Sequence, residues 1–93
     1  MEEKSSLEIE TKIKQILISD LEIDPEILSA VDSDTPLLGR GIGLDSVETL
    51  TLVAGIEEAF DIQIDDAALT AELFKSLGIL AEYVLQKVTA HRD

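Results

Sequence analysis

Residues 45–61 of this 93-residue chain read DSVETLTLVAGIEEAFD, and this stretch decides the fold. Asp45 with Glu48 three residues later is typical of a capping box, so we expect a helix that begins at Asp45 or Ser46 and ends near Phe60–Asp61. Projected at about 100° per residue, this helix has one apolar face that suits a hydrophobic core. That face carries Leu52, Val53, Ile56 and Phe60.

The same helix has a second apolar strip, formed by Val47, Leu50 and Ala54, which lies well away from the first face. One interpretation packs this strip beneath the long connection that precedes the helix, as a satellite of the core. The other interpretation leaves it exposed as a docking surface. Between Gly41 and Phe74 the sequence has eight acidic residues and no lysine or arginine, which favours a partner with a basic surface.

An amphipathic helix and a long connection precede this stretch. The apolar stripe of the helix predicts that it runs from Leu7 to about Asp20–Leu21, after the polar residues 1–6. Residues 22–44 contain both prolines and three glycines, which indicates a loop with a short helical turn near 26–30. A loop this long is expected to be pinned to the core by its apolar side chains. The stripe of the first helix consists of Ile9, Ile13, Ile16 and Leu17.

Two further helices are expected after the acidic stretch. Residues 65–74 predict a short helix capped by Asp65 or Asp66. A last helix begins after Ser76 and fades near Ala90, with an apolar stripe that continues the core. The expected total is three main helices and one short helix in a single domain over residues 1–93, with flexible ends at 1–6 and 91–93.

Composition narrows the possible functions. Twenty acidic residues against seven basic ones give a net charge of −13, so the chain should repel nucleic acid and anionic membranes. The chain has no cysteine, which excludes disulfides, thiolate catalysis and cysteine-based metal sites. No apolar run approaches the ~20 residues of a membrane span, and the acidic start lacks the apolar core of a signal peptide. We expect a cytoplasmic monomer without membrane insertion.

Catalytic and metal-binding arrangements are scarce in this sequence. His91 is the only histidine and lies third from the end, so neither a histidine triad nor a histidine metal site is expected. A hydrolase that uses Ser46 would lack a base within the helical frame. The acidic run 61–72 resembles a calcium-binding loop but has Asp66 where that loop needs glycine. We therefore expect no enzyme and no metal site.

The segment that opens the central helix offers a different kind of site. If Asp45 is the helix cap, Ser46 is the first helical residue, and its hydroxyl points to solvent at the positive end of the helix dipole. A phosphate attached to Ser46 would be favoured by the dipole and by free backbone N–H groups.

Two motifs at this spacing resemble the acyl carrier protein family. Gly43-Leu44-Asp45-Ser46-Val47-Glu48 is followed by Ile56-Glu57-Glu58-Ala59-Phe60-Asp61, and the resemblance covers nearly the whole chain. It implies an all-α four-helix bundle that is not an enzyme, with a short third helix and a long first loop. It also implies that Ser46, flanked by Asp45 and Val47, carries 4′-phosphopantetheine through a phosphodiester. The thiol of this arm would hold acyl groups as thioesters.

The resemblance implies partners as well. A phosphopantetheinyl transferase would install the arm from coenzyme A with Mg²⁺. Acyl-loading and acyl-processing enzymes of fatty-acid, lipid or polyketide pathways would dock through basic surfaces. The positions that match the family's docking surface are Glu48, Leu50, Thr51, Ala54, Glu57 and Glu58. Thr51 stands where fatty-acid carriers often have an acid.

Two alternatives stay open on the residues alone. The first is a D-alanyl or aminoacyl (peptidyl) carrier with the same arm, although Asp45 before Ser46 and the strong acidity favour an acyl carrier over a peptidyl one. The second is an acidic helical interaction module that never carries an arm and uses the Val47, Leu50 and Ala54 strip to bind a protein. Gly55, inside the central helix, would either loosen that helix or permit close packing.

Overall fold

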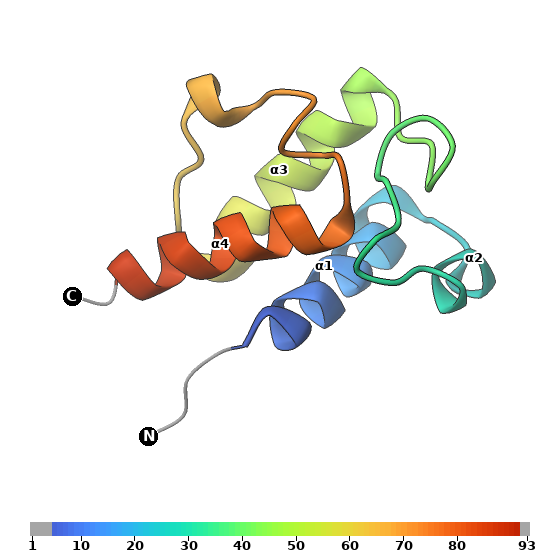
Figure 1. Ribbon diagram of the computed structural model, residues 1–93, viewed down its shortest axis with the longest axis horizontal. Coiled ribbons are helices and arrows are strands. Elements are labelled where there is room, and N and C mark those ends of the chain that lie inside the picture. The colour runs from blue at the N-terminus through green and yellow to red at the C-terminus, as the bar shows by residue number, and fades with distance from the viewer. Residues whose placement is uncertain (1–4, 92–93) are drawn as a thin grey trace.

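The computed structural model describes residues 5–91, with side chains for residues 5–89, and its regular elements are all helical. These elements are α1 (Ser6–Leu21), α2 (Pro25–Ser29), α3 (Ser46–Phe60), the 3₁₀ turn η1 (Asp66–Ala68) and α4 (Leu77–His91). α1 packs against both α3 and α4, and α2 lies on the connection between α1 and α3 (Figure 1). The predicted all-α bundle is confirmed.

α1 begins slightly earlier than the apolar stripe predicts. The Ser5 hydroxyl accepts a hydrogen bond from the Glu8 N–H at 3.3 Å, and the Glu8 carboxylate accepts one from the Ser5 N–H at 3.2 Å. This capping box starts the helix at Ser6, so two of the residues predicted to be a flexible end belong to the helix start. The remaining predicted ends, 1–4 and 92–93, lie outside the described residues, as does the side chain of His91.

The long connection is pinned to the core, as predicted. Its short helical turn forms as α2. Ile27 on this turn is apolar but points outward, with 53% of its surface exposed. The Lys14 ammonium donates to the Val31 carbonyl at 2.9 Å and ties the connection to α1. Its buried apolar residues are Leu28, Val31, Leu37 and Leu44.

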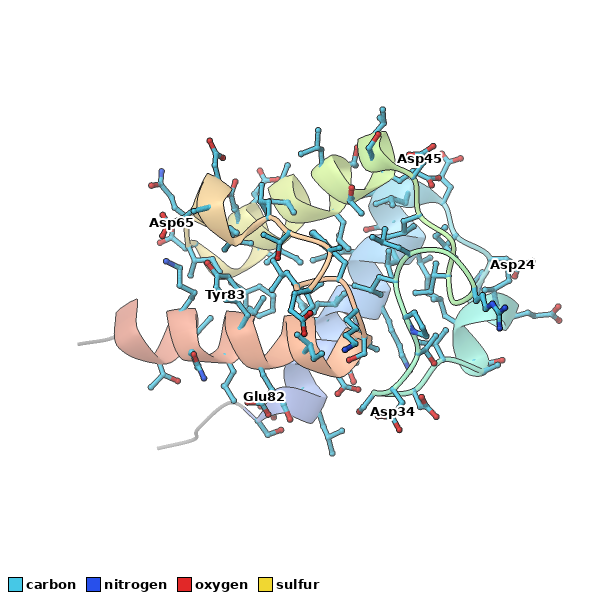
Figure 2. All side chains as sticks on the ribbon, turned by 45° about the horizontal axis from the view of Figure 1, so that its top comes forward. Asp24, Asp34, Asp45, Asp65, Glu82 and Tyr83 are labelled. Atoms are coloured by element: carbon cyan, nitrogen blue, oxygen red, sulfur yellow. The ribbon has the colours of Figure 1, made fainter. Side chains whose placement is uncertain are left out.

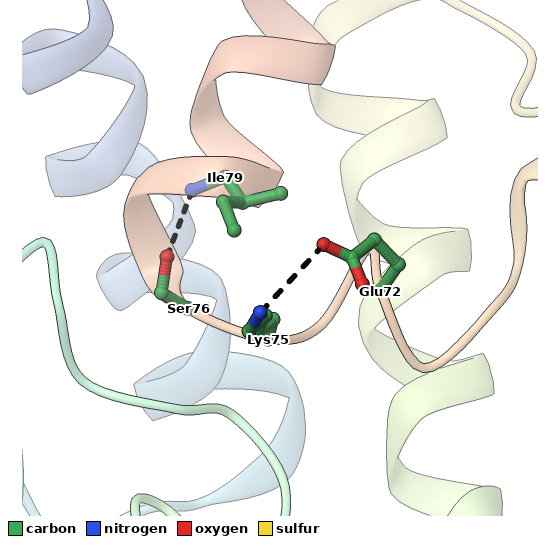
Figure 3. A network of polar contacts seen from close by, with 4 residues as sticks. All are labelled: Glu72, Lys75, Ser76 and Ile79. Atoms are coloured by element: carbon green, nitrogen blue, oxygen red, sulfur yellow. Dashed lines mark hydrogen bonds and ion pairs between the residues drawn. The ribbon is translucent and has the colours of Figure 1, made fainter.

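The same connection also holds the start of α4. The backbone N–H of Leu77 donates to the Thr35 carbonyl at 2.9 Å, and that of Gly78 donates to the Ser33 carbonyl at 2.8 Å. The Ser76 hydroxyl accepts from the Ile79 N–H at 3.1 Å and so caps α4 (Figure 3). α4 therefore begins directly after Ser76, as predicted.

The short helix predicted over residues 65–74 is wrong in extent. Only the 3₁₀ turn η1 and a second turn form there, and their backbone N–H groups donate to carbonyls three residues back rather than four. Asp65 occupies the cap position without a side-chain hydrogen bond. Residues 62–74, which include this segment, instead pass alongside α3 in an arch (Figure 1) and contribute four buried side chains to the core. These are Ile62, Ile64, Leu73 and Phe74. The buried side chains before and after η1 fix the path of the chain there.

Gly55 lies where α3 crosses α1. Of the two interpretations of this glycine, the structure favours close packing of the helices over loosening of α3. A Cβ atom at this position would lie 2.8 Å from Ile16 Cγ2 and 2.7 Å from Asp20 Oδ2, both on α1. Contacts this short do not occur between well-packed atoms, so glycine permits the two helices to approach each other.

Replacing Gly55 with valine should therefore destabilise the fold by about 1–3 kcal/mol, the usual cost of overpacking. The measurement is the urea midpoint followed by circular dichroism, at an unchanged slope. Ala54→Val is the matched control, because Ala54 is the preceding residue of the same helix and is exposed. This substitution should shift stability by no more than about 0.5 kcal/mol. Equal midpoints for the two variants would contradict this account of Gly55.

The surface charges are almost unpaired. In the described part of the chain only Lys75 and Glu72 form an ion pair, at 4.0 Å and with both side chains exposed (Figure 3). Acidic side chains such as Asp24, Asp34, Asp65 and Glu82 lie apart from one another around the molecule (Figure 2). With a net charge of −13, their mutual repulsion opposes the compact state.

Added salt or Mg²⁺ should raise the melting temperature. Screening acts over a Debye length of about 10 Å at 0.1 M salt, and relieving 1 kcal/mol of repulsion shifts Tm by about 4–8 °C in a domain of this size. We expect a rise of at least about 4 °C between low and moderate NaCl concentration in thermal melts. A melting curve insensitive to both salts would refute this prediction.

Candidate functional site

The first turn of α3 has the geometry that the sequence predicts. Asp45 is the N-cap and Ser46 is the first helical residue. Asp45 Oδ1 accepts from the Glu48 N–H at 2.7 Å, and Glu48 Oε1 accepts from the Asp45 N–H at 3.0 Å. Figure 2 shows Asp45 where the long connection joins α3. Both carboxylates of this capping box therefore position the helix start.

The Ser46 hydroxyl is exposed and free. Within the part of the chain that the structure describes, no hydrogen bond engages Ser46 Oγ, and the backbone N–H groups of Ser46 and Val47 have no acceptor. The helix dipole places partial positive charge at this end of α3. The site therefore presents a nucleophilic oxygen beside two free N–H donors, which is an arrangement suited to a phosphate group.

The Thr49 side chain stabilises this turn, a role that the sequence analysis did not predict. Thr49 is buried, and its hydroxyl lies 2.8 Å from the Ser46 carbonyl and 3.1 Å from the Asp45 carbonyl, to which it can donate. The sequence does contain a sign of this role, namely a threonine three residues after Ser46. A threonine hydroxyl in a helix can donate a hydrogen bond to a carbonyl three or four residues back.

A tight loop before α3 positions Asp45 and Ser46. The Leu44 N–H donates to the Leu37 carbonyl at 3.0 Å, and both of these leucines are buried. A Cβ atom on Gly41 would lie 1.7 Å from the Pro36 carbonyl oxygen, so only glycine fits the crossing of the loop. The chain immediately before the site is therefore anchored in the core.

The second apolar strip of α3 is exposed beside Ser46. Val47 is 70% exposed, Leu50 is 61% exposed, and Ala54 is also exposed. The interpretation that packs this strip beneath the 22–44 connection is wrong, because Val47 and Leu50 stay exposed and the connection places most of its apolar side chains in or against the core. The docking-surface interpretation is the one that the geometry permits.

The predicted docking acids divide into two groups. Glu48 is held in the capping box, and Glu57 Oε2 accepts from the Ile64 N–H at 2.9 Å, which fixes the chain after α3. Glu58 is exposed and lines a groove beside α1 together with Gly55. Thr51 is exposed as well, and its hydroxyl donates to the Val47 carbonyl at 3.2 Å. Only Glu58 thus offers a carboxylate without a structural hydrogen bond among the described contacts.

Across residues 5–89, no three histidine, cysteine, aspartate or glutamate side chains lie close enough together to hold a metal ion. None of the described helices is both long enough and apolar enough to cross a membrane.

Residues 11–84 match the family described as phosphopantetheine attachment site. The first turn of α3 fits this group, because it provides an exposed hydroxyl for a phosphodiester and free N–H groups for the phosphate oxygens. When bound, 4′-phosphopantetheine supplies a terminal thiol, which the chain itself lacks.

Curated relatives agree with this match. The chain is 37% identical over 83 residues to an acyl carrier protein of Guillardia theta, covering 89% of the chain and 95% of that protein. It is 34% identical over 79 residues to an acyl carrier protein of Bdellovibrio bacteriovorus, covering 85% of the chain and 94% of that protein. It is also 32% identical over 101 residues to the 6-hydroxypseudooxynicotine dehydrogenase complex subunit gamma of Paenarthrobacter nicotinovorans. That match covers 91% of the chain but only 13% of that subunit. The chain therefore belongs to the acyl carrier protein family and carries a covalently attached 4′-phosphopantetheine group.

Proposed function

We propose that Ser46 Oγ is the attachment point of the arm and that the protein carries acyl groups between acyl-processing enzymes. The observation that supports this most directly is the exposed Ser46 hydroxyl, which is free of hydrogen bonds to the described residues and lies at the positive end of α3. The anchored loop before Ser46 and the buried Thr49 after it keep this hydroxyl in a defined position. A defined position favours repeated recognition by separate enzymes.

The loading step requires a partner enzyme. Ser46 Oγ forms a bond to the phosphorus of the pantetheine phosphate of coenzyme A, while the bond from that phosphorus to the adenosine 3′,5′-bisphosphate leaving group breaks. The hydroxyl proton passes to a base supplied by a phosphopantetheinyl transferase, because Asp45 and Glu48, the carboxylates beside Ser46, are engaged in the capping box. The chain contributes the nucleophilic oxygen and the N–H groups that stabilise the phosphate.

Acyl groups are the cargo that we favour over aminoacyl groups. The two relatives that the chain spans almost completely are both acyl carrier proteins. The strong acidity of the chain and Asp45 before Ser46 point the same way. No dehydrogenase activity is proposed, because the chain spans only 13% of the dehydrogenase subunit.

Partner enzymes would dock on the strip formed by Val47, Leu50 and Ala54. This strip is apolar and exposed, and it begins one residue after Ser46. Acids surround it, and no lysine or arginine occurs between Gly41 and Phe74, so the surface suits enzymes with basic rims. We propose that the protein acts in this way as a cytoplasmic monomer of one domain, without catalytic activity of its own.

Loading of Ser46 can be tested by intact-mass spectrometry. The unmodified protein is incubated with coenzyme A, Mg²⁺ and a broad-specificity phosphopantetheinyl transferase. We expect the wild type to gain the mass of one phosphopantetheine and Ser46→Ala to gain none. The variant should remain folded, because Ser46 is exposed and its hydroxyl makes no described contact.

Ser29→Ala is the matched control, since Ser29 is an exposed serine at the end of α2. It should load like the wild type. Loading of Ser46→Ala would place the arm on another residue. Absence of loading in a folded wild-type protein would contradict the proposed attachment.

Docking on the strip can be tested by introducing a positive charge at Leu50. Leu50→Arg should lower kcat/KM for loading by about tenfold or more, because it puts a cation in the apolar contact that basic enzymes require. Its Tm should stay within a few degrees of the wild type, since the side chain is already 61% exposed. Leu7→Arg is the control, because Leu7 is 67% exposed on α1, far along the sequence from Ser46. Equal rates for both variants would argue against docking at Leu50.

A further inference from the structure

The strip formed by Val47, Leu50 and Ala54 continues into two acids on the same side of α3. Glu58 and Asp61 follow Ala54 at intervals of four and three residues, and this spacing places all five residues on one side of a helix. All five are exposed. This side of α3, which we call the docking face, is therefore apolar over the first half of the helix and acidic at its C-terminal end.

The two acids at the C-terminal end of the docking face have no partner within the bundle. Among the described residues, neither carboxylate forms an ion pair, and of the acids in this region only Glu57 accepts a hydrogen bond, from the Ile64 N–H. The last turn of α3 contains no basic residue, and the C-terminal end of a helix carries partial negative charge. Compensation of the charge on Glu58 and Asp61 is thus left to a cation from another molecule.

The first half of the docking face, by contrast, has no free carboxylate. Twenty of the 93 residues are acidic, yet Glu48 is the only acid from Ser46 to Ala54. Glu48 is only partly exposed, and its carboxylate closes the capping box at the positive end of the helix. Thr51 beside the strip is exposed but uncharged, and its hydroxyl donates to the Val47 carbonyl. Charge on this side of α3 is therefore segregated along the helix.

We propose that the docking face admits partner enzymes in one orientation, with an uncharged apolar patch over the strip and a lysine or arginine opposite Glu58 and Asp61. Glu58 is twelve residues from Ser46, or about 18 Å along α3, so the partner's cation lies about that far from the arm. A reversed partner would bring its cation to the positive end of the helix, where the carboxylates are already engaged. The inference rests on the proposed attachment of the arm to Ser46.

The uncharged middle of the docking face also excludes partners. An enzyme that presents a cation opposite Thr51 would bury that charge without a counter-charge, which lowers its affinity. Thr51 therefore acts as a specificity-determining residue, because it keeps the first half of the docking face neutral.

The orientation is tested with the broad-specificity phosphopantetheinyl transferase, by measuring kcat/KM for loading of the full chain at low and at moderate NaCl concentration. The double variant Glu58→Gln/Asp61→Asn removes the two acids. It should lower kcat/KM by about tenfold at low salt and remove most of its salt dependence.

Glu82→Gln/Asp34→Asn is the matched control for this double variant. Both variants change the net charge from −13 to −11, and all four residues are exposed. Figure 2 shows Glu82 and Asp34 on the side of the molecule away from Asp45 and the start of α3. The control should lower kcat/KM by less than about twofold, because it changes only the general attraction to a basic enzyme.

The neutral middle is tested by Thr51→Glu, with Thr11→Glu as its control. Both threonines are exposed in helices, and each hydroxyl donates to the carbonyl four residues back, at 3.2 and 3.1 Å. Thr51→Glu should lower kcat/KM by about fivefold, because it places a carboxylate beneath the partner's apolar patch, and Thr11→Glu by less than about twofold. Circular dichroism confirms that each variant is folded.

The outcomes separate this inference from the proposed function. A folded wild type that does not load would overturn the proposed attachment and this inference with it. A wild type that loads, with equal losses in the two double variants or with faster loading of Thr51→Glu, would overturn this inference alone.

Discussion

The fold depends on the aliphatic face of α1, which packs against both α3 and α4. Ile9, Ile13 and Leu17 are fully buried there, and burying one such side chain contributes about 1.5–3 kcal/mol. Aromatic residues make up only 3% of the chain, so branched aliphatic side chains must fill the core by close approach of the helices. Gly55 allows that approach at the crossing of α1 and α3, and the 22–44 connection closes the core where no helix covers it.

The core also determines the site. Leu37 and Leu44 anchor the connection on either side of a tight loop, and Leu44 is followed at once by Asp45 and Ser46. α3 then has two distinct faces. One face is buried against α1, and the opposite face is exposed with Val47 and Leu50 next to the free Ser46 hydroxyl. The positive end of the helix, the nucleophilic oxygen and the apolar strip are therefore adjacent because one helix presents all three.

The surface has too few cations to pair with its acids, since the chain has seven basic residues and twenty acidic ones. Acids hold structural positions at the starts of α1 and α3 and in the last turn of α3, where Glu57 accepts from the Ile64 N–H. Other acids, such as Glu58 and Asp20, have no such role in the bundle and remain available to positively charged partners. The same unpaired acids repel one another and so oppose the compact state.

Several features of the structure could be predicted from local residues. The boundaries of α3, the cap at Asp45 and the buried stripe of α1 follow from capping chemistry and from the helical period, which act over a few residues. The extent of the 65–74 segment could not be predicted in this way. Its helical tendency is overridden because Ile62, Ile64 and Phe74 are drawn into the core from both ends.

By itself, the sequence determined the all-α class and the position of Ser46 at a helix start, because both follow from interactions between near neighbours in the chain. It also carried the resemblance to acyl carriers, which rests on two motifs and their spacing. Only the tertiary structure decided whether the Val47, Leu50 and Ala54 strip is covered, since that depends on where a distant connection runs. It also decided that Gly55 serves close packing and that Asp20 faces it, because α1 and α3 meet there across more than 30 residues of sequence. Interactions between near neighbours determine where the helices begin and end. The packing of the whole chain determines which faces of the helices are buried and which are exposed.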